Sequence, residues 1–188
     1  ETTISLTDAE PVNYDADGEV VYNIGYGNNL ISYPFENGQG LEDGLGENAG
    51  DVYAIAGEGV AALAIEGTFV GSLTAFEGGN GYWLVATDDF SFSFNGVEEG
   101  LTRVEQPELR RVPELYSYRQ SDQQSFFFVK NATIRGEALE GDDIVIAYNG
   151  DVIVGSRFWN GELTDVPAIG VDPEAKEKFA GYAEAGDK

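Results

Sequence analysis

The fold of this chain is decided most clearly by the stretch Asp143-Ile144-Val145-Ile146-Ala147-Tyr148-Asn149-Gly150-Asp151-Val152-Ile153-Val154. Two apolar runs flank an Asn-Gly pair, which favours the positive backbone φ angles of a two-residue hairpin turn. We therefore predict two antiparallel strands in which Ile146 faces Ile153 and Val145 faces Val154. Both faces of this hairpin are apolar, so we expect it to be covered on both sides or to present one face to a partner.

The same period of two recurs in the rest of the chain. Apolar residues alternate with polar or small ones over residues 20–26 and 90–95, as in a strand with one buried face. The 25 glycines indicate tight turns between short strands. We predict an all-β fold of sandwich-like antiparallel sheets. Further strands are expected at residues 30–33, 52–56, 61–65, 81–86, 115–118 and 125–129.

Two segments have helical character. Asp172, Pro173 and Glu174 form a helix start signal, with Asp as the N-cap and Pro at the first helical position. Gly181 is expected to limit this helix to about two turns, so we predict a short C-terminal helix. Residues 41–45 stay open between helix and loop, because glycines in this region disfavour a helix.

The domain organisation follows from shifts in composition. Residues 1–18 are expected to form an N-terminal extended segment and an acidic turn, and residues 19–188 a β-sandwich domain. The charged, proline-bearing stretch near 96–114 has two interpretations: a long crossover within one sandwich, or a linker that splits the domain in two. We favour the crossover, because neither half alone offers enough strands to cover the apolar hairpin.

The composition excludes several classes of function. The 188 residues include 34 Asp and Glu against 10 Lys and Arg, a net charge of −24, which excludes nucleic acid as a partner. The absence of Cys and His removes disulfides, thiolate and imidazole metal sites, and catalytic triads. No run approaches the roughly 20 apolar residues of a membrane span. Ser72 lacks both a nucleophile elbow and a histidine base.

The location is expected to be extracellular or at the cell surface. The chain begins at Glu1 without an initiator Met, so we expect that a leader has been removed. An acidic surface stays hydrated where salt screens its self-repulsion, and it attracts divalent cations.

A calcium site is predicted near the N-terminus. Asn13, Asp15 and Asp17 place oxygen ligands at alternate positions before Gly18, as in the first half of a calcium-binding loop. The twelfth position is Ile24, where such a loop needs a bidentate Glu, so a distant acid or main-chain carbonyls would have to complete the site. The alternative is an acidic turn that precedes a strand.

Four further residues are candidate contacts with a ligand or another subunit. Ile4 and Leu6 alternate with polar residues in a β-prone segment, which can pair with its own sheet or with the open edge of a neighbour. Trp83 and Trp159 can stack on the apolar faces of sugar rings or fill a sandwich core. Consecutive phenylalanines at 126–128 must point to both faces of a strand, so at least one should meet a second layer or another molecule.

Several segments of the sequence resemble those of a known group of proteins. Residues 29–35, 57–62, 71–73 and 81–83, and later 141–151 and 165–168, are similar to uncharacterised secreted β modules of large surface proteins of marine bacteria. The resemblance implies an extracellular β-sandwich and carries no catalytic residue. In such relatives the sequence after the segment that corresponds to 181–187 continues into another strand. We therefore expect either that the chain is trimmed or that a neighbouring subunit supplies that strand.

We therefore expect a non-enzymatic extracellular structural or adhesive module. Its specific version is a subunit of a surface filament assembled by strand addition and stabilised by calcium, with further copies or other surface proteins as partners. The alternative is a carbohydrate-binding module of a secreted protein that uses Trp83 or Trp159. A glycosidase with two opposed carboxylates ranks third, because chance pairs are frequent among 34 acids.

Overall fold

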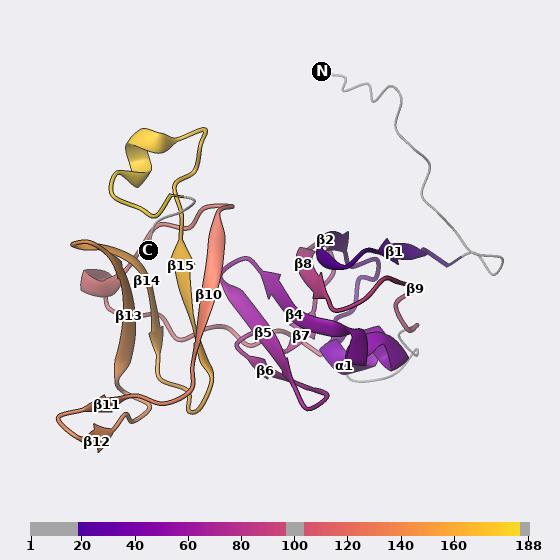
Figure 1. Ribbon diagram of the computed structural model, residues 1–188, viewed down its shortest axis with the longest axis horizontal. Coiled ribbons are helices and arrows are strands. Elements are labelled where there is room, and N and C mark those ends of the chain that lie inside the picture. The colour runs from indigo at the N-terminus through magenta and orange to yellow at the C-terminus, as the bar shows by residue number, and fades with distance from the viewer. Residues whose placement is uncertain (1–18, 97–103, 185–188) are drawn as a thin grey trace.

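The fold is described from a computed structural model, which covers residues 19–96 and 104–184 (Figure 1). The molecule is mostly β, and the paired strands of this part of the chain are antiparallel. The first group of strands comprises β1 (Tyr22–Ile24), β2 (Gly27–Ser32), β3 (Gln39–Gly40), β4 (Val52–Gly57), β5 (Val60–Ile65), β6 (Thr68–Gly71), β7 (Ala75–Phe76), β8 (Gly81–Ala86) and β9 (Phe90–Phe92). The second comprises β10 (Gln124–Val129), β11 (Thr133–Ile134), β12 (Glu137–Ala138), β13 (Ile144–Asn149), β14 (Val152–Phe158) and β15 (Thr164–Ile169).

The first group is built on a five-stranded sheet in the order β2-β8-β4-β5-β6, with the small pairs β1-β9 and β3-β7 beside it. Its inward positions, such as Ile31, Ile55 and Leu84, are buried. They pack with aromatic rings of the loops and short strands, including Phe76 and Phe94, whose ring centroids lie 5.0 Å apart. Alternation of apolar and polar residues therefore produces this core, and the strands predicted within residues 20–95 are confirmed.

The α-helix lies near the N-terminal core and not at the C-terminus. α1 (Leu41–Leu45) continues into a 3-10 helix η1 (Gly46–Asp51), and it buries Leu41 and Leu45. From the sequence, the glycines leave residues 41–45 open between helix and loop. In the structure, packing explains why position 44 is a glycine. A Cβ at Gly44 would lie 2.9 Å from the ring of Phe76, so only glycine lets the helix approach the aromatic cluster this closely.

The predicted short C-terminal helix is wrong. Asp172 does start a turn, in which its side chain accepts a hydrogen bond from the Glu174 backbone N–H at 2.8 Å. However, the chain then forms only η3 (Lys176–Phe179), a single 3-10 turn. Gly181 has a φ of +82° and stops the helix early, and so short a segment has too few backbone hydrogen bonds to sustain an α-helix alone.

The hairpin predicted from residues 143–154 is present as β13-β14, but its predicted register is wrong. Gly150 and Asp151 form the turn, and Ile146 faces Ser156. Gly150 takes a φ of +58°, and a bulge between Ala147 and Tyr148 precedes the turn. Glycine at the first turn position suits a type II′ turn, which moves the register relative to an Asn-Gly turn.

The predicted strand at 115–118 is also wrong, because a 3-10 turn η2 (Glu114–Tyr116) begins there after Pro113. Of the crossover between the two groups, the structure describes residues 104–123, which contain no strand. The division of the chain into 1–18 and 19–188, and the split near 96–114, stay predictions.

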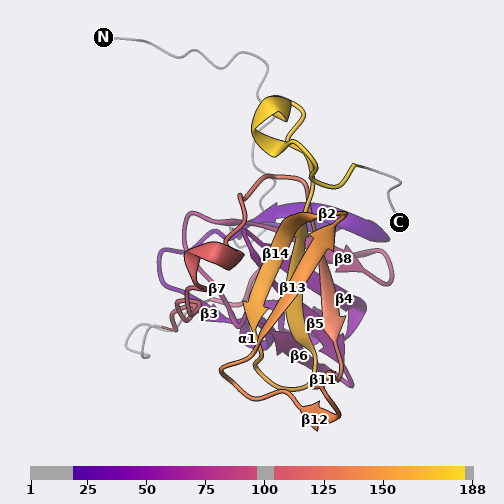
Figure 2. The same ribbon diagram turned by 90° about the vertical axis from the view of Figure 1, so that its left-hand side faces the viewer.

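The second group of strands forms a curved layer in the order β13, β14, β15 and β10. β13 pairs with β14 and β15 with β10, and β14 lies directly beside β15 (Figures 1 and 2). The two backbones approach so closely that a Cβ at Gly155 would overlap the carbonyl oxygen of Pro167. Glycine is therefore required where β14 meets β15.

Candidate functional site

Three side chains of the second group of strands hold it against the first group. The amide of Gln124 donates to the Gly57 carbonyl at 2.7 Å and accepts from the Gly59 N–H at 3.1 Å. Arg157 donates to the Gly59 carbonyl at 2.7 Å. Asp165 accepts a hydrogen bond of 2.6 Å from the Ser72 hydroxyl. The strand registers place these three side chains on one side of the curved layer, which therefore faces the first group.

Arg157 and Asp165 form a buried ion pair at this junction. The Nη2 of Arg157 lies 3.0 Å from the Oδ2 of Asp165, and the residues are 8% and 2% exposed. Burial raises the pKa of the Asp165 carboxyl above its ordinary value, while Arg157 and the Ser72 hydroxyl oppose this rise. These contacts join the two groups of strands, because Asp165 binds Arg157 of the second group and Ser72 of the first.

A cleft of about 480 Å³ lies beside the junction, between β6, the crossover and the β14–β15 loop. Trp159 lines it and is half-buried. The guanidinium of Arg110 sits 3.7 Å from the ring centroid of Phe158 and donates to the carboxylate of Asp142 at 2.8 Å. Leu163 in the same loop has a φ of +65°. A bulky residue in this left-handed region is strained, and such strain is often found at binding loops.

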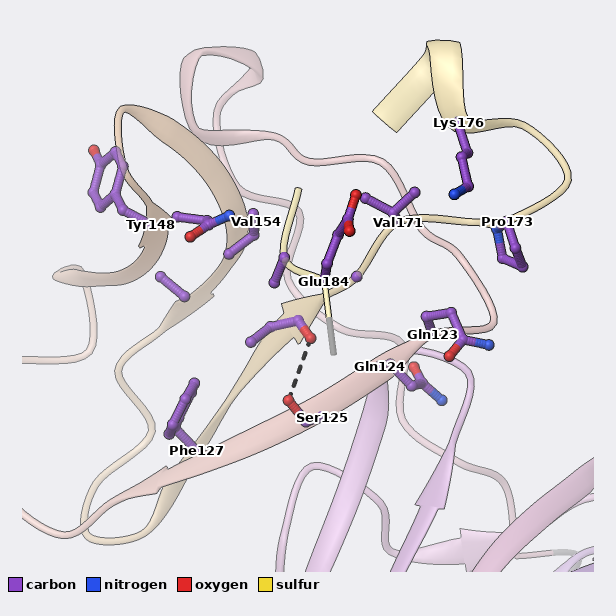
Figure 3. Close-up of a pocket in the computed structure, with 15 residues that line it drawn as sticks. Gln123, Gln124, Ser125, Phe127, Tyr148, Val154, Val171, Pro173, Lys176 and Glu184 are labelled. Carbon is purple, nitrogen blue, oxygen red and sulfur yellow. Dashed lines mark hydrogen bonds between the residues drawn. The ribbon is translucent and has the colours of Figure 1, made fainter. Parts of the chain in front are cut away.

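A larger groove of about 610 Å³ crosses the opposite side of the curved layer (Figure 3). Phe127 and Ser125 from β10 face it, together with Val154 from β14. Tyr148 stands at the end of β13, and Lys176 comes from the C-terminal segment on the far side. The groove thus has an apolar floor and a polar margin, as binding sites for peptides and small molecules do.

The strands on the two sides of this groove are open edges. Among the residues that the structure describes, β10 pairs only with β15 and β13 only with β14. Neither strand contains a charged residue or a proline, which are the usual protections against pairing with another chain. The groove is therefore flanked by two unprotected edges that can accept a further strand.

The predicted site residues fall in different places. Trp159 lines the cleft, whereas Trp83 is on the outer side of the five-stranded sheet, where it faces Leu30 and is 44% exposed. Ile4 and Leu6, and the predicted calcium ligands Asn13, Asp15 and Asp17, lie outside the described residues. Within residues 19–96 and 104–184, no three acidic side chains come close enough together to hold a metal ion.

The groove itself was not predicted as a site. The three consecutive phenylalanines gave the only signal: Phe127 is 61% exposed on the groove side, while Phe126 and Phe128 are half-buried on the other. Tyr148 is 56% exposed. The sequence did not indicate it as a groove residue, because the predicted hairpin register placed it directly beside the turn.

The charges are distributed unevenly along the chain. The ten Lys and Arg all lie between Arg103 and Lys188, so residues 1–102 carry acidic side chains and no basic one. The first group of strands is therefore strongly negative, and the cations are spread over the crossover, the second group of strands and the C-terminal segment, together with 16 acidic residues. In the part of the chain that is described, no helix has the length and apolar character needed to cross a membrane.

No family model, curated protein or solved structure matches this chain.

Proposed function

We propose that this protein is a non-enzymatic structural or adhesive module of an extracellular assembly. The observation that carries the proposal is the groove between β10 and β13, where an apolar floor lies between two strand edges without charge or proline. An edge of this kind is stabilised when it pairs with another strand, because its backbone groups and its apolar side chains then leave water together. Its partners are further copies of the chain or other surface proteins.

The rest of the molecule suits a scaffold. Hydrogen bonds from Gln124, Arg157 and Ser72 join the two groups of strands, so we further propose that they act as one sandwich-like body. The charge of −24 keeps such a surface hydrated in saline surroundings. The resemblance to secreted modules of marine bacterial surface proteins agrees with an extracellular location.

Electron microscopy and sedimentation velocity of the purified chain test this function. We expect oligomers or filaments that grow with protein concentration. Particles that stay monomeric at every concentration, with calcium and with a chelator, would contradict the proposal.

Calcium is proposed as a stabiliser of the assembly through Asn13, Asp15 and Asp17. Oxygen ligands at alternate positions suit a hard cation. Isothermal titration with calcium should show binding that the double variant Asp15→Asn, Asp17→Asn abolishes. As a matched control, Asp88→Asn, Asp89→Asn removes two adjacent charges elsewhere and should leave it intact. Equal binding by both variants would contradict this site.

A second function, carbohydrate binding, is favoured by the cleft that Trp159 lines. Beside this aromatic ring, Ser72, Thr74 and Asp165 offer hydroxyl and carboxylate groups, the combination that recognises sugars by stacking and hydrogen bonds. The chain has only two tryptophans, so in a Trp83→Phe variant the tryptophan fluorescence, excited selectively over that of tyrosine, comes from Trp159 alone. Saturable quenching by soluble oligosaccharides would support this function, and no response across a glycan array would contradict it.

A further inference from the structure

We propose that residues 3–7 of a second copy of this chain add as a strand in the groove between β10 and β13. This inference rests on the proposed function and specifies its contact: the donor segment is Thr3-Ile4-Ser5-Leu6-Thr7. The acceptor is the groove whose lining includes Ser125 and Phe127 of β10 and Tyr148 of β13, drawn in Figure 3.

The donor segment matches the acceptor in length. β10 and β13 each have six residues, which corresponds to about 20 Å of strand. Five donor residues extend over about 17 Å at the same rise. One added strand can therefore pair along nearly the whole of an open edge.

The side chains of the donor also match the groove. In a strand, Ile4 and Leu6 point to one side, and Thr3, Ser5 and Thr7 to the other. The groove offers Phe127 and Val154 on its floor. With the two apolar residues turned toward this floor, the polar residues remain in water.

The arrangement of the molecule favours a donor from another copy. β1, where the described part of the chain begins, lies at the opposite end of the molecule from β13, and β10 lies between them beside β5 (Figure 1). Residues 8–18 can span at most about 40 Å when fully extended. A neighbour placed head to tail brings its own β1 end beside the groove, and a head-to-tail contact repeats into a filament.

The charges support the same orientation. Residues 1–18 contain acidic side chains and no basic one, whereas every Lys and Arg lies after residue 102. Lys176 and Glu184 both lie at the margin of the groove. Residues 103–188 carry 16 Asp and Glu against 10 Lys and Arg, whereas residues 1–102 carry 18 acids and no cation. The head-to-tail contact therefore brings the acidic segment to the less negative part of the neighbour, where it meets less repulsion.

Cross-linking between single-cysteine variants tests this contact, and the chain has no native cysteine to confuse it. A full-length Thr7→Cys variant is mixed with a Ser125→Cys variant, treated with a short bismaleimide and analysed by mass spectrometry. The matched control replaces the acceptor by Asn28→Cys, an exposed position on the edge strand β2. We expect the dimer that links residue 7 to residue 125 to be several-fold more abundant than the one that links residue 7 to residue 28.

The outcomes separate this inference from the proposed function. If the chain assembles but residue 7 links equally to both positions, or mainly to residue 28, the strand-donor contact is wrong and the module function stands. If a Thr7→Cys, Ser125→Cys double variant links mainly within one copy, the donor acts on its own subunit and the inference is also wrong. If sedimentation shows only monomers, both proposals fail.

A pair of charge substitutions gives an independent readout. Ile4→Asp, Leu6→Asp places carboxylates against the apolar floor and should abolish assembly. The Thr3→Asp, Ser5→Asp variant adds the same charge on the side of the strand that faces water, and it should retain most of the assembly. Equal loss of assembly in both variants would overturn the inference, because it would show that charge alone and not the side of the strand matters.

Discussion

At the scale of single residues, Asp165 and Arg157 bind the two groups of strands together through their buried pair. Asp165→Ala should lower the free energy of unfolding by about 3–5 kcal/mol, because it leaves the Arg157 charge buried without its partner. Lys130→Ala, which breaks an exposed pair with Glu162 at 3.6 Å, should cost about 0–1 kcal/mol. Urea unfolding of both variants measures the difference. Equal small losses would mean that water reaches Arg157 once the carboxylate is gone.

The raised pKa of Asp165 gives a dependence on pH with a definite sign. The carboxyl of the unfolded chain loses its proton at its ordinary pKa, while the folded chain holds the proton to a higher pH. Between these two values the folded state binds more protons, so this residue makes stability fall as pH rises. The difference in free energy of unfolding between the native chain and the Asp165→Asn variant should therefore decrease as the pH rises from the unfolded-state pKa of Asp165 to its folded-state pKa. An increase would show that Arg157 dominates over burial.

The sequence predicts single residues unevenly. It indicated that Trp159 could contact a ligand, and Trp159 does line a cleft. It did not predict that Asp165 would be buried, because an acid in the phrase Asp165-Val166-Pro167 looks like any other of the 34. Its burial depends on Arg157 from another strand and on Ser72 from the first group, and neither contact has a signature in the local sequence.

At the scale of elements, the close approach of β14 and β15 depends on Gly155. Gly155→Ala places a Cβ against the carbonyl of Pro167 and should destabilise the protein by about 3 kcal/mol, since the strands must separate. Gly141→Ala is the matched control, because the nearest atom to its Cβ would be 4.0 Å away. Thermal unfolding should leave the control close to the native chain. Similar losses in both variants would contradict the packing of these strands.

Most strands follow from the alternation of apolar and polar residues, but their partners do not. The hairpin of residues 143–154 was found, yet its register depends on a bulge at Ala147 and on a Gly150-Asp151 turn. The sequence leaves residues 41–45 open between helix and loop. The fit of Gly44 against Phe76 is a tertiary contact that overrides the poor helix propensity of glycine. Tertiary packing, which the local pattern does not contain, accounts for these differences.

At the scale of the whole molecule, assembly must overcome repulsion between copies that each carry a charge of −24. The screening length falls from about 30 Å at 0.01 M salt to about 10 Å at 0.1 M. At constant protein concentration, the assembled fraction should therefore rise with sodium chloride over this range. Light scattering measures it. Assemblies that dissolve as salt is added would mean that ion pairs between copies, and not burial of apolar groups, hold them together.

The central claim is that copies of this chain associate through the open edges beside the groove. Hydrogen exchange measured over a series of protein concentrations tests it most directly. As association proceeds, amides of β10 (Gln124–Val129) and β13 (Ile144–Asn149) should gain protection, while those of the edge strand β2 (Gly27–Ser32) should not. Association without added protection in β10 and β13 would contradict the account.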